Sequence, residues 1–209
     1  MNVNRSMLLG LGLILCLAGP LSAQADAAAG QAVFVQCGAC HGADGAGMPG
    51  MTAPAIAGLE TWYVVRQLQN YKAGIRGSHP DDSYGAPMAL MAQTLATDAD
   101  IANMAAYVAS LPPQPLTDTE GGDAAAGQTA YAMCAACHGA DGRGVEAMNA
   151  PNLTLQQDWY VVLQLQNFKA GIRGAHADDM YGMQMAPMAR ILADDDAMKN
   201  IAAYLVTLR

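Results

Sequence analysis

The sequence predicts an all-α protein made of two tandem domains, each a small helical fold. Three observations lead to this prediction. Apolar residues recur at helical spacing in both halves, no stretch shows a convincing strand alternation, and the second half repeats the first. A length of 209 residues allows one large or two small domains, and the repeat favours two.

The repeat is direct, because a shift of 97 residues aligns the halves without a gap. The matched segments are Ala27–Gln31 with Ala124–Gln128, Trp62–Val65 with Trp159–Val162, Lys72–Gly77 with Lys169–Gly174, and Ala105–Tyr107 with Ala202–Tyr204. We therefore expect domains at 26–112 and 123–209, joined by a linker at 113–122. Prolines in the linker favour an extended, semi-rigid connection.

Three main helices are expected in each domain. In the first domain they cover about 26–36, 60–73 and 98–110. Trp62, Val65 and Leu68 have helical spacing in the second helix, while Asp98 is a plausible cap of the third and Pro112 follows its end. The Gly-, Pro- and Met-rich segments between the helices are expected to be loops.

One glycine falls inside the first helix of each domain, where it costs about 1 kcal/mol relative to alanine. Gly30 is easier to understand if the first and last helices cross closely there, with the Tyr107 ring packed nearby. Gly127 and Tyr204 repeat the pair. The alternative is that Gly30 only marks an irregular helix.

Each half contains a Cys-x-x-Cys-His motif, which is the attachment pattern of c-type haem. Each thiol can add to one vinyl group of a haem, and the histidine then lies under the iron as an axial ligand. The motifs predict two covalently bound haem c groups. The attachment residues are Cys37, Cys40, Cys134 and Cys137, and the axial histidines are His41 and His138.

The motif has two other interpretations. A Cys-x-x-Cys redox motif would be expected near a βαβ pattern, which the sequence does not show. A zinc site would need four ligands in one place, whereas each cluster stands alone. Of the five cysteines, Cys16 lies in the apolar N-terminal run, and the two motifs use the other four.

The first 25 residues have the pattern of a secretory signal peptide. Arg5 supplies the positive start, residues 7–18 form a short apolar run, and Ala-Gln-Ala at 23–25 is a cleavage site. We expect a mature chain from Asp26 and a periplasmic location, because c-type haem is attached outside the bacterial cytoplasm. The alternative is an uncleaved anchor, although the run is short for a span of about 20 residues.

The charge balance is acidic. Removing Arg5 from the ten basic residues leaves nine against 18 acidic ones. This argues against nucleic acid and anionic membrane surfaces, which attract basic patches. A negative surface is usually only a solvated one, but it can also steer a basic partner. Peripheral membrane association stays open as an alternative.

A haem with one histidine needs a sixth ligand or keeps an open site. A methionine thioether raises the reduction potential and closes the iron to small molecules. The repeat pairs Met51 with Met148, Met88 with Met185, and Met91 with Met188. The first pair lies close to the haem motif, from which the opposite haem face is awkward to reach. His79 and His176 also match, either as ligands of a bis-histidine haem or as loop residues.

The whole pattern resembles the di-haem cytochromes c of the cytochrome c4 type. The resemblance rests on an Asp-Ala-Ala-Ala-Gly-Gln opening, Cys-x-x-Cys-His, Lys-Ala-Gly, Met-x-x-Met and a closing Ala-Ala-Tyr, each present twice. It implies two class I cytochrome c domains, each wrapped around a covalent haem. It also implies that the haems lie close together at the interface of domains related by a rough two-fold axis.

The resemblance also suggests the sixth ligands. In that family the iron-bound methionine lies seven residues before the apolar residue that precedes the last helix. This rule points to Met88 and Met185, with Met91 and Met188 as the alternatives that would pack beside the haem. The match is imperfect. Ala-Pro precedes Met88, the first methionine of its motif, but in the other half it precedes Met188, the second methionine.

Further residues acquire expected roles from the same comparison. Pro54 and Pro151 either accept the histidine ring N–H through their carbonyls or form plain turns. The aromatic and basic residues expected to bond or screen the haem propionates, or to pack in the core, are Trp62, Tyr63, Arg76, Trp159, Tyr160 and Arg173. Arg66 has no counterpart, because Leu163 takes its place, so a haem role shared by both domains is not expected there.

We expect an electron carrier rather than an enzyme, with iron that changes oxidation state but not ligands. The resemblance implies that a quinol-oxidising complex supplies the electrons and a terminal oxidase or another respiratory acceptor takes them. One alternative is the cytochrome subunit of a sulfur- or alcohol-oxidising dehydrogenase complex. The other is a haem peroxidase or gas sensor, which needs an open iron site.

Overall fold

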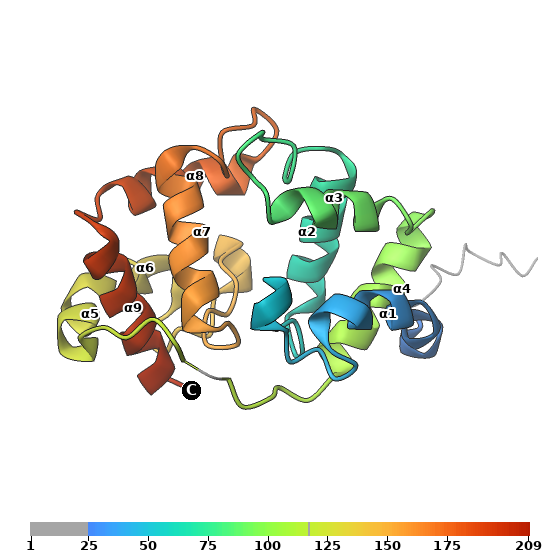
Figure 1. Ribbon diagram of the computed structural model, residues 1–209, viewed down its shortest axis with the longest axis horizontal. Coiled ribbons are helices and arrows are strands. Elements are labelled where there is room, and N and C mark those ends of the chain that lie inside the picture. Colours follow the sequence, from blue (N-terminus) through green and yellow to red (C-terminus); the bar gives the residue numbers. More distant parts are fainter. Residues whose placement is uncertain (1–24, 117) are drawn as a thin grey trace, which may run out of the picture.

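The computed structural model describes residues 25–116 and 118–209, which form two helical units side by side (Figure 1). The first unit holds α1 (Ala27–His41), α2 (Thr61–Lys72), α3 (Gly85–Ala92) and α4 (Asp98–Ser110). The second holds α5 (Ala124–Tyr131), α6 (Ala135–His138), α7 (Asp158–Ala170), α8 (Met180–Arg190) and α9 (Asp195–Thr207). The expected signal peptide falls almost entirely on residues 1–24, outside the described ones.

The all-α prediction is confirmed for the described residues. Their only extended pairing consists of two isolated bridges, one between Met48 and Ala53 and one between Val145 and Ala150. Two 3₁₀ turns, η1 (Pro49–Met51) and η2 (Glu146–Met148), lie inside these bridges. In the part of the chain with assigned structure, no helix is both long and apolar enough to cross a membrane.

Short polar side chains cap the first and last helices of both units. The Asp26 carboxylate accepts the backbone N–H groups of Ala28 and Ala29, at 2.8 and 3.3 Å, which satisfies donors left free at a helix start. The cap of α4 is not Asp98, as the sequence suggested. Thr97 caps the helix, in a capping box with Asp100.

A close helix crossing builds the core of each unit. A Cβ atom on Gly30 would collide with the carbonyl of Asn103 and lie 2.9 Å from the Cβ of Tyr107. Gly127 meets Asn200 and Tyr204 in the same way. The close-crossing prediction is confirmed. The first core gathers Phe34, Leu59, Val64, Leu95, Ile101, Met104, Ala105 and Val108.

The methionine-rich segments differ from the prediction, because they are helices and not loops. Pro87 sits in the first turn of α3, where its missing N–H costs nothing. The Asp82 carboxylate accepts the N–H of Gly85 at 2.8 Å and starts this helix. In the second unit Pro187 lies within α8. Helix α1 is also longer than expected, since it runs through the motif to His41.

The two units meet through equivalent hydrogen bonds, with α2 and α7 nearest the centre of the molecule (Figure 1). Ala55 donates its N–H to Gln157 Oε1 at 2.7 Å, and Asn152 donates its N–H to Glu60 Oε1 at 3.0 Å. Positions 55 and 152, like 60 and 157, are partners under the repeat. The interface therefore has the reciprocal contacts of a two-fold arrangement.

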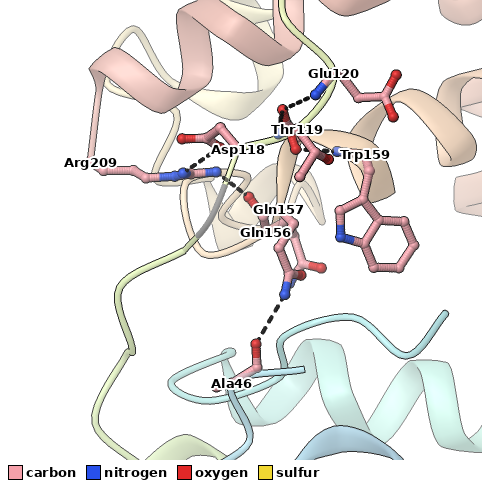
Figure 2. A network of polar contacts seen from close by, with 9 residues as sticks. Ala46, Asp118, Thr119, Glu120, Gln156, Gln157, Trp159 and Arg209 are labelled. Carbon is pink, nitrogen blue, oxygen red and sulfur yellow. Dashed lines mark hydrogen bonds and ion pairs between the residues drawn. The ribbon is translucent and has the colours of Figure 1, made fainter. Parts of the chain in front are cut away.

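The segment between α4 and α5 is fixed to the second unit (Figure 2). The Asp158 carboxylate accepts the N–H groups of Thr119 and Glu120, at 2.6 and 2.7 Å. The Arg209 guanidinium pairs with Asp118 at 2.8 Å and donates to the carbonyl of Gln156 at 2.6 Å. The connection is thus held in place by its own contacts and is not a free tether.

Candidate haem sites

The two Cys-x-x-Cys-His motifs lie at helix ends. Cys37, Cys40 and His41 occupy the last turn and a half of α1, so that the two thiols, three residues apart, share one helix face. Cys134 precedes α6, and Cys137 and His138 end it. None of these four cysteines is in a disulfide, and burial raises the pKa of the Cys37 and Cys134 thiols. Each motif therefore presents two thiols and an imidazole together.

The histidine rings are held by proline carbonyls. His41 Nδ1 donates to the carbonyl of Pro54 at 2.8 Å, and His138 Nδ1 donates to that of Pro151 at 2.9 Å. This confirms the expected proline role. Burial lowers the pKa of both histidines, more than the carbonyl contact raises it. Burial therefore favours the neutral rings, in which Nδ1 carries the proton and the lone pair on Nε2 is available to a metal.

In the first unit, the free nitrogen of the imidazole faces a thioether. His41 Nε2 lies 3.5 Å from Sδ of Met88, which projects from α3. These two atoms are the ones that would hold a haem iron bound between α1 and α3, since an imidazole nitrogen and a thioether sulfur are both haem-iron ligands. Met91 lies one turn further along α3.

In the second unit, a cavity opens beside the motif. Cys134, Cys137, His138, Met185 and Met188 all line it, with apolar walls from Tyr131, Leu165, Phe168, Ile201 and Leu205. The first unit contributes Tyr63, Arg66 and Gln67. Such a site fits a flat apolar ring with two carboxylates, because apolar walls, two thiols, a neutral imidazole and cationic residues meet around one space.

His79 and His176 lie in loops and have partners there. Each ring accepts a backbone N–H two residues further on, from Asp81 at 3.1 Å and from Asp178 at 3.2 Å. Their Nδ1 atoms also lie 3.9 and 3.8 Å from the carboxylates of these residues. This arrangement gives both histidines a local partner in the loops before α3 and α8.

Two arginines, buried Arg76 and half-buried Arg173, lie where the units meet. Arg76 donates to Tyr160 Oη at 2.8 Å and to Gln67 and Gln164 at 2.8 and 3.0 Å. Arg173 donates to Gln164 at 2.6 Å, to Gln67 at 3.1 Å and to Tyr63 Oη at 3.5 Å. These are the same contacts under the repeat. The expected aromatic and basic residues are thus brought together across the interface.

This cluster is electrostatically unbalanced. Among the described residues, neither arginine has a carboxylate within salt-bridge distance. Burial would raise the pKa of Tyr63, but the charges of Arg173, Arg76 and Arg66 outweigh it and lower that pKa. Because buried cations are stable only when compensated, the interface suits the carboxylates of a bound group.

Some site residues were not anticipated from the sequence. Gln67 and Gln164 bond both arginines, and their match under the repeat was the signal that could have revealed them. Trp62 and Trp159 were expected near propionates. Trp62 lies under the Arg66 guanidinium at 4.9 Å, and Trp159 packs against Tyr160 with ring centres 5.6 Å apart.

Comparisons with known proteins agree with this geometry. The family model "Cytochrome c" matches twice, at residues 27–112 and 124–209. Cytochrome c4 of Azotobacter vinelandii is 35% identical over 211 residues, covering 95% of this chain and 96% of that protein. The thiosulfate dehydrogenase electron acceptor of Stutzerimonas stutzeri is 28% identical over 208 residues, with 90% of each chain covered.

A solved structure extends the likeness to the arrangement of the whole molecule. The crystal structure of reduced recombinant cytochrome c4 from Pseudomonas stutzeri superposes with a TM-score of 0.67 at 30% identity. The match covers 87% of this chain and 97% of that chain. With two family matches and a full-length likeness, the chain belongs to the cytochrome c family, as a di-haem electron-transfer cytochrome of the cytochrome c4 type with two covalently bound haem c groups.

Proposed function

We propose that the protein is a periplasmic one-electron carrier whose irons are held by His41 with Met88 and by His138 with Met185. The observation that carries the proposal is the Met88 thioether facing His41 Nε2 at 3.5 Å. The repeat extends it to Met185, which lines the same cavity as His138. A site closed on both faces favours carrying electrons over binding substrates.

The protein residues keep each site rigid. When bound, a haem supplies an iron that accepts and releases one electron. Pro54 and Pro151 fix the two imidazoles through hydrogen bonds of 2.8 and 2.9 Å, and this carbonyl contact raises the basicity of the rings as ligands. The apolar cavity walls would surround a bound haem and limit the access of water to it. Little has to rearrange when the charge changes, which favours fast transfer.

The contacts between the two units support electron transfer from one haem site to the other. Reciprocal bonds through Gln157 and Glu60 hold the loops that follow both motifs, and the arginine cluster lies between α2 and α7. Each domain thereby keeps a fixed position relative to the other. We infer that an electron entering at one haem can be relayed to the second without domain motion.

For the partners, the acidic composition supports redox proteins with basic docking faces. A quinol-oxidising complex or a dehydrogenase would supply electrons, and a terminal oxidase would take them. The resemblance to a thiosulfate dehydrogenase electron acceptor favours a thiosulfate-oxidising enzyme as one donor.

Spectroscopy of the mature protein tests this function. We expect its mass to include two haems, the ferric form to show the far-red absorption band of methionine–iron ligation, and the reduced form not to bind carbon monoxide at neutral pH. Carbon monoxide binding by the unmodified reduced protein would instead favour a gas sensor or peroxidase. A mass without two haems would end the proposal.

A further inference from the structure

Arg66 is a charged residue that breaks the symmetry of the interface. Arg66 on α2 belongs to the first unit, and the 97-residue repeat places Leu163 at its counterpart on α7. The other arginines of the interface, Arg76 and Arg173, replace one another under the repeat. A charge that one unit has and the other lacks can make two otherwise similar haem sites unequal.

Arg66 is held by the second unit. Its guanidinium donates to Oδ1 and to the backbone carbonyl of Asn149, at 3.1 and 3.0 Å. It also lies over the ring of Tyr181, 4.5 Å from its centre. On the opposite side of the interface, the counterpart of Tyr181 is Tyr84, whose side chain is 49% exposed. The contact therefore exists on one side only.

The guanidinium also faces the second haem site. Arg66 lines the same cavity as His138 and Met185, although its backbone belongs to the other unit. Asp179 lines this cavity too, but its carboxylate accepts the N–H of Gly182, and Asp82 repeats that role in the first unit. Asp179 therefore does not distinguish the two units, whereas Arg66 does.

We propose that Arg66 of the first domain is a positioning residue of the second haem site, and that its charge raises the reduction potential of the second haem. A nearby positive charge favours the state with one more electron. An arginine stays protonated in proteins, so the effect persists at all physiological pH values. This inference rests on the proposed one-electron role of both haems, and it directs electrons from the first haem to the second.

The expected shift in the reduction potential of the second haem is large enough to measure. A unit charge about 10 Å from a redox centre, at an effective dielectric constant near 20, changes a reduction equilibrium by roughly tenfold. For a one-electron couple a tenfold change corresponds to about 59 mV. Even a fraction of this shift can be resolved in a titration of the full-length protein carrying both haems.

The test compares Arg66→Gln with Arg66→Lys. Both variants lose the two-pronged contact with Asn149, but only the first loses the charge. A redox titration followed by NMR of the haem methyl groups gives one midpoint for each haem, assigned through contacts with its own pocket. We expect Arg66→Gln to lower the midpoint of the second haem by more than that of the first, and Arg66→Lys to retain most of the wild-type value.

Three results would overturn the role of Arg66: equal shifts in both variants, no shift in Arg66→Gln, or a larger shift at the first haem. Arg66→Leu, which copies the residue at 163, serves as a second uncharged variant if the glutamine variant folds poorly. The proposed function fails separately, when the wild-type protein itself does not show two reversible one-electron steps.

Discussion

A single imidazole shows how the site is assembled at the residue scale. The carbonyl of Pro54 holds one nitrogen of His41, and the thioether of Met88 faces the other. The ring cannot turn without losing the first contact. The polypeptide therefore fixes the orientation of the imidazole, which is the geometry that the proposed ligand role needs.

Replacing Met88 by alanine should open one iron. We expect Met88→Ala to lower the reduction potential of the first haem and to let carbon monoxide bind one of the two reduced haems, because the soft sixth ligand is gone. Titration and carbon monoxide difference spectra measure both effects. Met91→Ala is the matched control, one turn along α3. If only the control changes the spectrum, Met91 is the ligand.

A second prediction concerns a buried carboxylate at the interface. Glu60 Oε1 accepts the N–H of Asn152, whereas Oε2 is buried without a partner among the described residues. In its counterpart Gln157, both polar atoms of the side chain are bonded. Oε1 accepts the N–H of Ala55, and Nε2 donates to the carbonyl of Ala46 at 2.9 Å. We expect Glu60→Gln to add about 1 kcal/mol of unfolding free energy in urea titrations.

The reverse change provides the control. Gln157→Glu removes the donor to Ala46 and should cost about 1–3 kcal/mol. A lower free energy of unfolding in Glu60→Gln would instead show that Oε2 makes a stabilising interaction that is not among the contacts of Glu60 with the described residues.

At this scale the sequence predicted the local chemistry well. The cysteines and histidines follow from one short motif, because covalent attachment fixes their spacing. The repeat reduced 14 methionines to a few pairs. The repeat offered Gln67 and Gln164 as a matched pair, but the cross-unit bonds of Arg76 could not be predicted, since they depend on how two separately patterned units meet.

At the scale of elements, the crossing of the first and last helices decides the packing of each unit. Phe34 and Tyr107 meet edge to face with ring centres 5.0 Å apart. Tyr131 and Tyr204 form the equivalent pair in the second unit, with tilted rings whose centres lie 5.4 Å apart. Only a glycine lets the two backbones approach this closely.

Gly30→Ala tests that crossing. Helix propensity alone would make alanine stabilising by about 1 kcal/mol. The collision with the Asn103 carbonyl should reverse the sign and cost about 1–3 kcal/mol of unfolding free energy. Gly50→Ala is the control, because no atom lies within 4 Å of its added Cβ. A gain of stability at Gly30 would contradict the close approach.

Helices with a clear apolar stripe were predicted almost to the residue. Helix α2 was expected at 60–73 and spans Thr61–Lys72. The prediction missed helices α3 and α8, because these segments contain Pro87 and Pro187 and proline usually ends a helix. In α3 the proline occupies the tolerant first turn, whereas in α8 tertiary packing overrides it. Buried Ala186 and Ala189 show the face that α8 packs inward.

At the scale of the whole molecule, the segment between α4 and α5 does more than link the two units. It also makes hydrogen bonds and an ion pair with the second unit. Asp158 accepts two N–H groups from the segment, and Arg209 at the last position pairs with Asp118 (Figure 2). Gln157 then reaches across to Ala46 in the first unit. The segment and the interface therefore stabilise the same arrangement.

Asp158→Ala should release this segment without touching either haem site. Two backbone N–H groups lose their acceptor, so we expect proteases to cut near residues 118–120 at least several times faster than in the wild type. Limited proteolysis with mass spectrometry measures the rate. The haem spectra and both midpoints should stay unchanged, and an unchanged cleavage rate would show that other contacts suffice.

The reciprocal bonds between the units have an evolutionary consequence. Ala55 with Gln157 and Asn152 with Glu60 are one contact made twice, as two identical chains make it in a homodimer. Fusing two copies of a self-associating ancestor would produce this interface directly. Once the copies shared one gene, each could mutate alone, and a single arginine could enter one half without its mirror image.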